Sequence, residues 1–148
     1  MYTLTLASHN IVRWLVLGTG LWAVVRCWMG WRSRAVWSEK DAGAVKLLVN
    51  ALTLQFVLGV VLYAVSPLIR AGLADMATAM KTASVRYFVV EHVAVMLVAI
   101  ALGHIGAAKV RKAESDSARF QTATIWLGLA LAAAAGFVPW DRPILPSF

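Results

Sequence analysis

Four apolar runs, each about as long as a bilayer is thick, follow one another in a chain of 148 residues. A helix of about 20 apolar residues crosses the hydrocarbon core of a membrane. With 61% hydrophobic and only 14% charged residues, the chain cannot cover a folded core with a water-soluble surface. We therefore expect one domain over residues 1–148, an all-α, polytopic transmembrane four-helix bundle with helices at about 9–31, 46–69, 85–108 and 120–138.

The basic residues lie at the ends of the apolar runs, which is how membrane proteins fix their orientation. For this reason the net charge of +7 does not indicate a nucleic-acid partner. Nine basic residues fall in or beside the first and third connections: Arg26, Arg32, Arg34, Lys40, Lys46, Lys109, Arg111, Lys112 and Arg119. The other five are Arg13, Arg70, Lys81, Arg86 and Arg142. The positive-inside rule places the first group in the cytoplasm and both termini on the periplasmic side of a bacterial inner (cytoplasmic) membrane.

Three further segments carry weaker signals. The stretch 70–84 has Leu and Met at helical spacing, which predicts a short helix on the membrane surface or over the mouth of the bundle. The prolines of 139–148 predict an extended tail across the outer surface. Residues 1–10 lack the basic start of a cleavable signal peptide, so we expect the first run to stay in the membrane.

Polar side chains within apolar runs are costly to bury, and they therefore mark candidate functional positions. His9 and His92 lie toward the outer leaflet on two different predicted helices. Two imidazoles on separate helices can hold the iron of one haem b between them. Arg13 and Arg86 are near the same level and suit the carboxylates of the haem propionates. The pattern predicts a haem b site with His9 and His92 as the iron ligands.

Other residues extend this candidate site. Gly20 and Gly103 follow the two histidines by eleven residues each, a spacing that returns to nearly the same helix face and makes room for a haem ring. Three more polar side chains in the outer half of the bundle are candidates for binding a quinone or taking its proton: Glu91, Gln55 and Tyr63. His104 is twelve residues from His92, about 18 Å deeper and on another face, so we expect it to play no part in the same site.

The motifs form a recognisable set: His9 with Arg13 and Trp14, Gln55 with Gly59 and Tyr63, Ser66-Pro67, Arg86, Glu91-His92 with Met96, and Gly103-His104-Ile105-Gly106. This set resembles a family of small four-helix bacterial membrane proteins labelled cytochrome b-like. The resemblance covers the first three predicted helices, while the fourth matches only in hydropathy. It implies a haem-binding helical membrane protein and carries nothing about a substrate.

Three functions remain open from the sequence. The favoured one is a small b-type cytochrome, or the haem-binding subunit of a membrane redox complex, that transfers electrons near the outer face, with a quinone as a possible partner. Such a chain is an electron-transfer or accessory subunit rather than a stand-alone enzyme. The alternative is a non-catalytic structural subunit of a larger respiratory or photosynthetic membrane complex. A transporter fragment is disfavoured because the 120–138 helix contains no ionisable residue.

Overall fold

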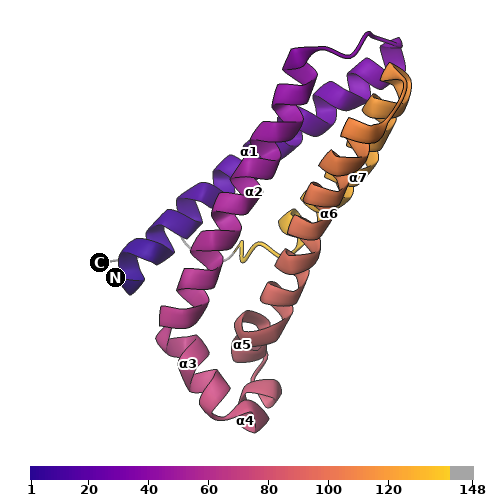
Figure 1. Ribbon diagram of the computed structural model, residues 1–148. Coiled ribbons are helices and arrows are strands. Elements are labelled where there is room, and N and C mark those ends of the chain that lie inside the picture. Colours follow the sequence, from indigo (N-terminus) through magenta and orange to yellow (C-terminus); the bar gives the residue numbers. More distant parts are fainter. Residues whose placement is uncertain (141–148) are drawn as a thin grey trace.

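The computed structural model describes residues 1–140, which are helical apart from short connections. Two long helices, α1 (Tyr2–Ser33) and α2 (Glu39–Val65), form one antiparallel pair, and α6 (His92–Lys112) and α7 (Asp116–Gly136) form a second (Figure 1). The predicted all-α class is confirmed, since the described residues contain no strand. Arg142 and most of the predicted tail 139–148 lie outside the described residues.

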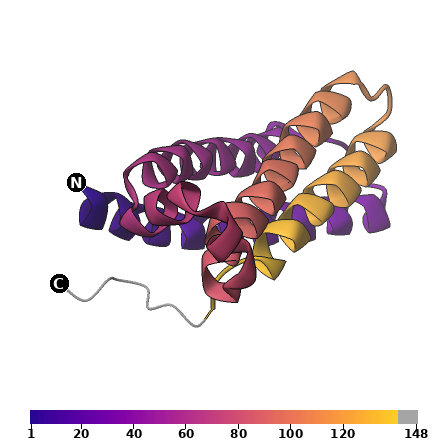
Figure 2. The same ribbon diagram turned by 90° about the horizontal axis from the view of Figure 1, so that it is seen from below.

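The two helix pairs meet mainly through α7, which packs against both α6 and α1, while α2 and α6 touch over a shorter stretch. Figure 2 shows the α6–α7 pair inclined to the α1–α2 pair. Small and branched side chains fill the interface of α1 and α2 with α7, including Ala23, Leu48 and Leu127, none of which is more than 1% exposed. The helices are therefore closely packed at one end and diverge toward the other.

Three helical stretches are long and apolar enough to cross a membrane: Tyr2–Ser33, Glu39–Val65 and Ala83–Lys112. The fourth long helix, α7, is not among them, because polar residues such as Gln121, Thr122 and Thr124 occupy its first half. The chain therefore has the helices of a membrane protein, and the predicted fourth span stays a prediction.

The helices extend beyond the apolar runs because their caps lie in polar sequence. The α2 helix begins at a capping box, in which Asp41 accepts hydrogen bonds from the backbone N–H of Ser38 at 2.8 Å and from its hydroxyl. Ser115 caps α7 by accepting from the N–H of Ala118 at 3.2 Å. Hydropathy locates the apolar part of each helix but not these ends.

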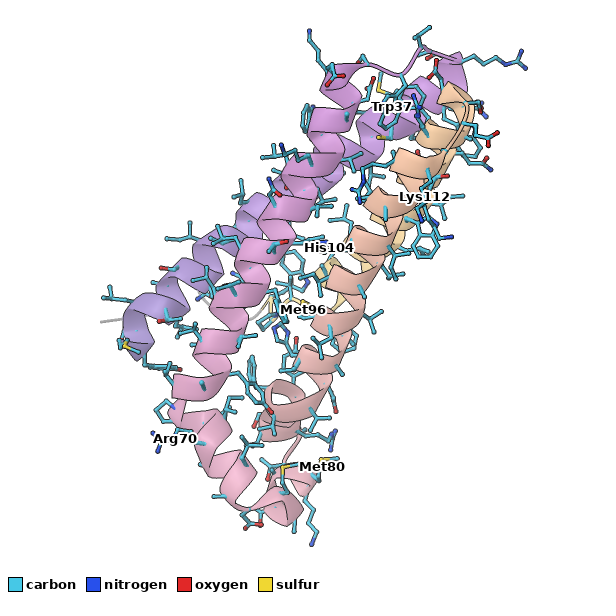
Figure 3. The ribbon with its side chains drawn as sticks, in the orientation of Figure 1. Trp37, Arg70, Met80, Met96, His104 and Lys112 are labelled. Carbon is cyan, nitrogen blue, oxygen red and sulfur yellow. The ribbon has the colours of Figure 1, made fainter. Side chains whose placement is uncertain are left out.

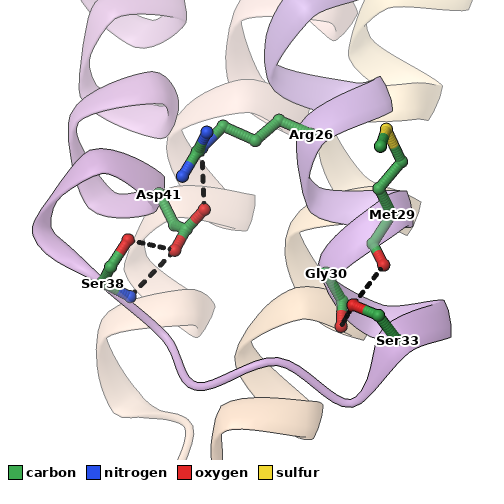
Figure 4. Close-up of polar contacts among 6 residues, drawn as sticks. All are labelled: Arg26, Met29, Gly30, Ser33, Ser38 and Asp41. Carbon is green, nitrogen blue, oxygen red and sulfur yellow. Dashed lines mark hydrogen bonds and ion pairs between the residues drawn. The ribbon is translucent and has the colours of Figure 1, made fainter.

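An ion pair between a half-buried arginine and a buried aspartate lies at the end of the bundle where α1 turns into α2 (Figure 4). The guanidinium of Arg26 lies 2.8 Å from the carboxylate of Asp41, which is also held by Ser38. Nearby, the hydroxyl of Ser33 donates to the carbonyl of Met29 at 2.9 Å. Asp41 is 4% exposed, so its charge depends on these partners.

The opposite end carries a chain of short helices rather than the single helix expected over 70–84. They are α3 (Pro67–Ala74), α4 (Met76–Lys81) and α5 (Ala83–Arg86), followed by a π-helical turn, η1 (Tyr87–Glu91), that leads into α6. Pro67 begins α3 at a position where a helix needs no backbone N–H donor. Asp75 caps α4 by accepting from the N–H of Thr78, and hydrogen bonds from Thr78 lower the pKa of the Asp75 carboxyl.

Candidate functional site

His9 of α1 and His92 of α6 meet in the interior, although they lie 83 residues apart in the sequence. The centres of their rings are 6.4 Å apart, with the ring planes inclined by 69°. Metal–imidazole bonds of about 2 Å on either side of one metal ion would set two ring centres roughly 6 Å apart. The two rings come to the same level because α1 already begins at Tyr2 and is inclined to α6 (Figure 2).

The orientation of His92 is fixed from outside the cavity. Its Nδ1 lies 2.9 Å from the carbonyl oxygen of Phe137, just beyond the end of α7. A carbonyl only accepts, so Nδ1 carries the hydrogen and Nε2 carries the lone pair of the neutral ring. The hydroxyl of Tyr87 donates to the same carbonyl at 2.7 Å. This is the second-sphere arrangement that orients a metal-binding histidine.

His9 is held by α2 instead. Its Nε2 lies 3.2 Å from the side-chain amide nitrogen of Gln55, and its ring rests against Gly59, where an added Cβ would lie 3.4 Å from Cε1. Gln55 and Gly59 are one helical turn apart, so the ring of His9 lies on one face of α2. Coordination of a metal through Nε2 of His9 therefore requires the Gln55 amide to move aside.

The two histidines line a cavity of about 660 Å³ between α1, α2, α3 and α6. This volume is in the range of roughly 300–1,000 Å³ that is typical of cofactor and ligand sites. Most of the lining is aliphatic or aromatic, with polar side chains concentrated on the α1 wall and the facing part of α2. The residues used below are His9, Asn10, Arg13, Gln55, Gly59, Tyr63, His92 and Met96. Figure 3 places Met96 on α6 where that helix faces α2.

Polar atoms without a hydrogen-bond partner gather around this cavity. They are Nδ1 of His9, Nε and Nη1 of Arg13, and Oε1 of Gln55. Arg13 is 7% exposed, and its contact with the ring of Trp14, 5.5 Å from the ring centre, supplies no carboxylate. A buried guanidinium without an anion is costly, and a ligand that accepts hydrogen bonds and carries negative charge would offset this cost.

Two of the predicted site residues lie away from the cavity and bind each other. Arg86 donates from Nε to the carboxylate of Glu91 at 2.6 Å and from Nη1 to the carbonyl of Met80 at 2.9 Å. Neither charged residue lines the cavity. The π-helical turn causes this pairing, because five residues separate the two and one wider turn brings such positions together. Arg86 as a propionate partner and Glu91 as a proton acceptor are therefore not supported by position.

The two predicted glycines serve helix packing rather than the cavity. A Cβ on Gly20 would lie 2.8 Å from Leu131 of α7, and one on Gly103 would lie 2.7 Å from Leu52 of α2. The glycine that lies against His9 is Gly59, which was not singled out from the sequence as space for a haem. The available signal was that Gln55, Gly59 and Tyr63 share one helix face.

The remaining candidates divide clearly. Tyr63 lines the cavity, and its hydroxyl donates to the backbone carbonyl of Val89 at 3.0 Å. His104 does not line the cavity, and its Nε2 lies 3.0 Å from the hydroxyl of Thr53 on the exposed side of α2 and α6. Asn10 is a cavity residue that the sequence did not single out; it is 9% exposed and next to His9.

The donor set fits haem b by its chemistry: two neutral imidazoles, a buried guanidinium for a carboxylate, and apolar walls for a macrocycle. Within residues 1–140, no group of three or more His, Cys, Asp or Glu side chains gathers to hold a bare metal ion. Comparisons with family models, with curated proteins and with solved structures found no match to this chain.

Proposed function

We propose that this chain is a small b-type cytochrome, or the haem-binding membrane subunit of a redox complex. In this proposal His9 and His92 ligate the iron of one haem b, and Arg13 binds a haem propionate. The observation that carries it is the set of unpartnered polar atoms on His9, Arg13 and Gln55 around one apolar cavity. A haem in that cavity supplies one-electron transfer, and the protein contributes binding, orientation and the field around the iron.

Each residue has a separate task in this proposal. His92 presents Nε2 because Phe137 holds its other nitrogen. His9 would hold the iron through Nε2 in place of its contact with the Gln55 amide. The positive charge of Arg13 neutralises a carboxylate that would otherwise be costly in an apolar site. Gln55 and Tyr63 are the cavity residues that we assign to contact with a quinone as the electron donor or acceptor, which makes lipid-soluble quinone the proposed redox partner.

The proposed location is a bacterial inner membrane with both termini in the periplasm. This orientation requires both connections rich in Lys and Arg to lie on one side of the membrane. In the structure they lie together at the end of the bundle opposite α3–α5, which supports the orientation (Figure 1). A reporter enzyme fused after residue 148 should be active as a periplasmic type and inactive as a cytoplasmic type. The reverse pattern contradicts the orientation and the outer placement of the haem.

A reduced-minus-oxidised absorption spectrum of the detergent-purified chain tests the function. The parent and the His104→Ala variant should both show the sharp α and β bands of a six-coordinate b-type haem, since His104 lies outside the cavity. His9→Ala and His92→Ala should give five-coordinate or lost haem while the chain still inserts, because insertion depends on hydropathy.

The two rival results are equally clear. A parent that carries no haem supports the second function, a structural subunit packed within a larger respiratory or photosynthetic membrane complex. A variant series in which His104→Ala loses haem and His9→Ala keeps it would show that the ligands are wrongly assigned.

A further inference from the structure

The helices α2 and α6 are joined at two levels and are open between them. At the level nearer the basic loops, Leu52 packs on Gly103, and Thr53 is hydrogen bonded to His104 at 3.0 Å. At the other level the hydroxyl of Tyr63 binds the carbonyl of Val89, just before α6. Leu52 and Tyr63 are eleven residues apart, which corresponds to about 16 Å of helix.

Between these two levels the cavity wall reaches the outer surface. Four large side chains both line the cavity and are exposed: Phe56 at 38%, Val60 at 52%, Leu97 at 48% and Leu68 at 39%. The first three belong to α2 and α6 and Leu68 belongs to α3, while the cavity residues of α1 and α7 are buried or half-buried. The opening therefore lies on the side of the bundle, between α2 and α6, where Met96 is labelled in Figure 3.

The end of the cavity is covered. Ser66 and Ile69, at the start of α3, line it and are only 6% and 5% exposed, and Leu68 between them lines it with an apolar side chain that is 39% exposed. Val138, after α7, is buried on the same cavity. A ligand arriving from water at this end would have to displace α3, whereas the side opening is already present and has an entirely apolar rim.

We propose that haem reaches the cavity from the membrane itself, sideways between α2 and α6, with Phe56, Val60 and Leu97 as the rim of the entrance. This inference rests on the proposed function. Both helices of the entrance belong to stretches apolar enough to span a membrane, so the rim faces lipid. Haem is an amphiphile that dissolves in lipid, and its apolar ring edge can pass an apolar rim while a carboxylate is drawn to Arg13, the buried cation inside.

The experiment measures haem transfer between vesicles. The apo form of the full chain, reconstituted in phosphatidylcholine vesicles, is mixed with donor vesicles of the same lipid that contain haemin, and the Soret band is followed in time. The entrance variants are Val60→Trp and Leu97→Trp. The matched control is Val57→Trp, because Val57 is on the same helix as Val60 and is 51% exposed but does not line the cavity.

A narrowed entrance slows passage in both directions without changing the final binding. Uptake by each entrance variant should be at least about tenfold slower than by the parent, and so should haem release to an acceptor, while the final haem content per chain is unchanged. Val57→Trp should behave as the parent does. Two variants on different helices are used so that a folding defect in one leaves the other as the test.

Each alternative result is decisive. Equal uptake by the parent and both entrance variants overturns the lateral route and leaves the proposed haem site in place. Equal slowing by Val57→Trp also overturns it, because the effect would then come from any bulky residue on the lipid face. A parent that takes up no haem from the vesicles and shows no haem bands overturns the proposed function, and the route falls with it.

Discussion

Two arginines on the same helix, Arg26 and Arg13, have different surroundings. Arg26, at the closed end of the bundle beside the basic loops, is half-buried, and its Nε forms an ion pair at 2.8 Å with Asp41, whose other oxygen is held by Ser38. Arg13, thirteen residues earlier on α1 and toward the other, open end, is buried, has two nitrogens without a hydrogen-bond partner and lines a cavity. The charge of Arg26 is therefore neutralised by a carboxylate of the chain, whereas no carboxylate among the described residues pairs with Arg13.

The packing of the two ends differs in the same way. At the closed end, the space beside Gly30 is filled by the ring of Phe120, and Cys27 is fully buried nearby. At the open end, Gly59 faces only the ring of His9 and lines a cavity of about 660 Å³. Proteins leave buried polar groups unsatisfied and space unfilled mostly where they bind something. The contrast between the two ends therefore supports a binding site at the open end and a structural role for the closed end.

The largest effect is expected at the closed end. Asp41→Ala removes the partner of Arg26 and the capping box of α2, and it should lower the free energy of unfolding by about 2–3 kcal/mol. Thermal unfolding in detergent, followed by circular dichroism, measures this loss. The control is Asp116→Ala, which removes an exposed ion pair with Arg119 and should cost under about 1 kcal/mol. Equal losses in both variants would mean that the closed end has no special role.

At the open end, we expect a substitution to leave the stability of the apo chain unchanged or to raise it. Arg13→Met removes a buried, unpaired charge, so the apo chain should unfold at the same or a higher temperature than the parent. Haem affinity should fall about tenfold or more, equivalent to about 1.4 kcal/mol, because a propionate loses its cation. Arg13→Lys keeps the charge without the two-pronged geometry and should fall between them. A clear loss of apo stability in Arg13→Met would show that Arg13 is as structural as Arg26.

Particular residues show how much of the difference between the two ends could be predicted from the sequence. The runs of apolar residues were enough to locate the four long helices, because a helix of about 20 apolar residues matches the thickness of a bilayer, and three helical stretches are long and apolar enough to cross a membrane. The sequence also placed His9 and His92 toward the same leaflet, on two different helices. The structure adds the ring separation and the fixed tautomer of His92, which depend on Phe137 from another helix.

The failures have physical causes too. Arg86 and Glu91 were placed in the site as separate groups, but a π-helical turn, which hydropathy does not reveal, pairs them with each other. Gly20 and Gly103 were read as space for a ring, whereas neighbouring helices occupy that space. A glycine in the sequence indicates that another group packs closely against the backbone there, but it does not identify that group. The limited hydropathy of α7, where Gln121 and two threonines interrupt the run, likewise leaves its membrane crossing a prediction.

The smallest effect is expected at Gly59, which lies against the ring of His9 at the open end. Gly59→Ala places a methyl 3.4 Å from the ring, which must shift by a few tenths of an ångström. We expect haem affinity to fall about threefold. Gly18→Ala is the matched control, since a Cβ there meets nothing within 4 Å. Both variants should gain up to about 1 kcal/mol of helix stability, so haem titration rather than melting distinguishes them. Equal affinities would place His9 off the iron.

The most direct test of the haem site is the electron paramagnetic resonance spectrum of the purified, oxidised chain. Two imidazoles on one ferric iron give a low-spin signal, and the account predicts this signal in the parent. His92→Ala should convert it to a high-spin signal or remove it, since Nε2 of His92 is the nitrogen presented to the cavity. A high-spin signal in the parent, or a low-spin signal that survives in both His9→Ala and His92→Ala, would contradict the central claim.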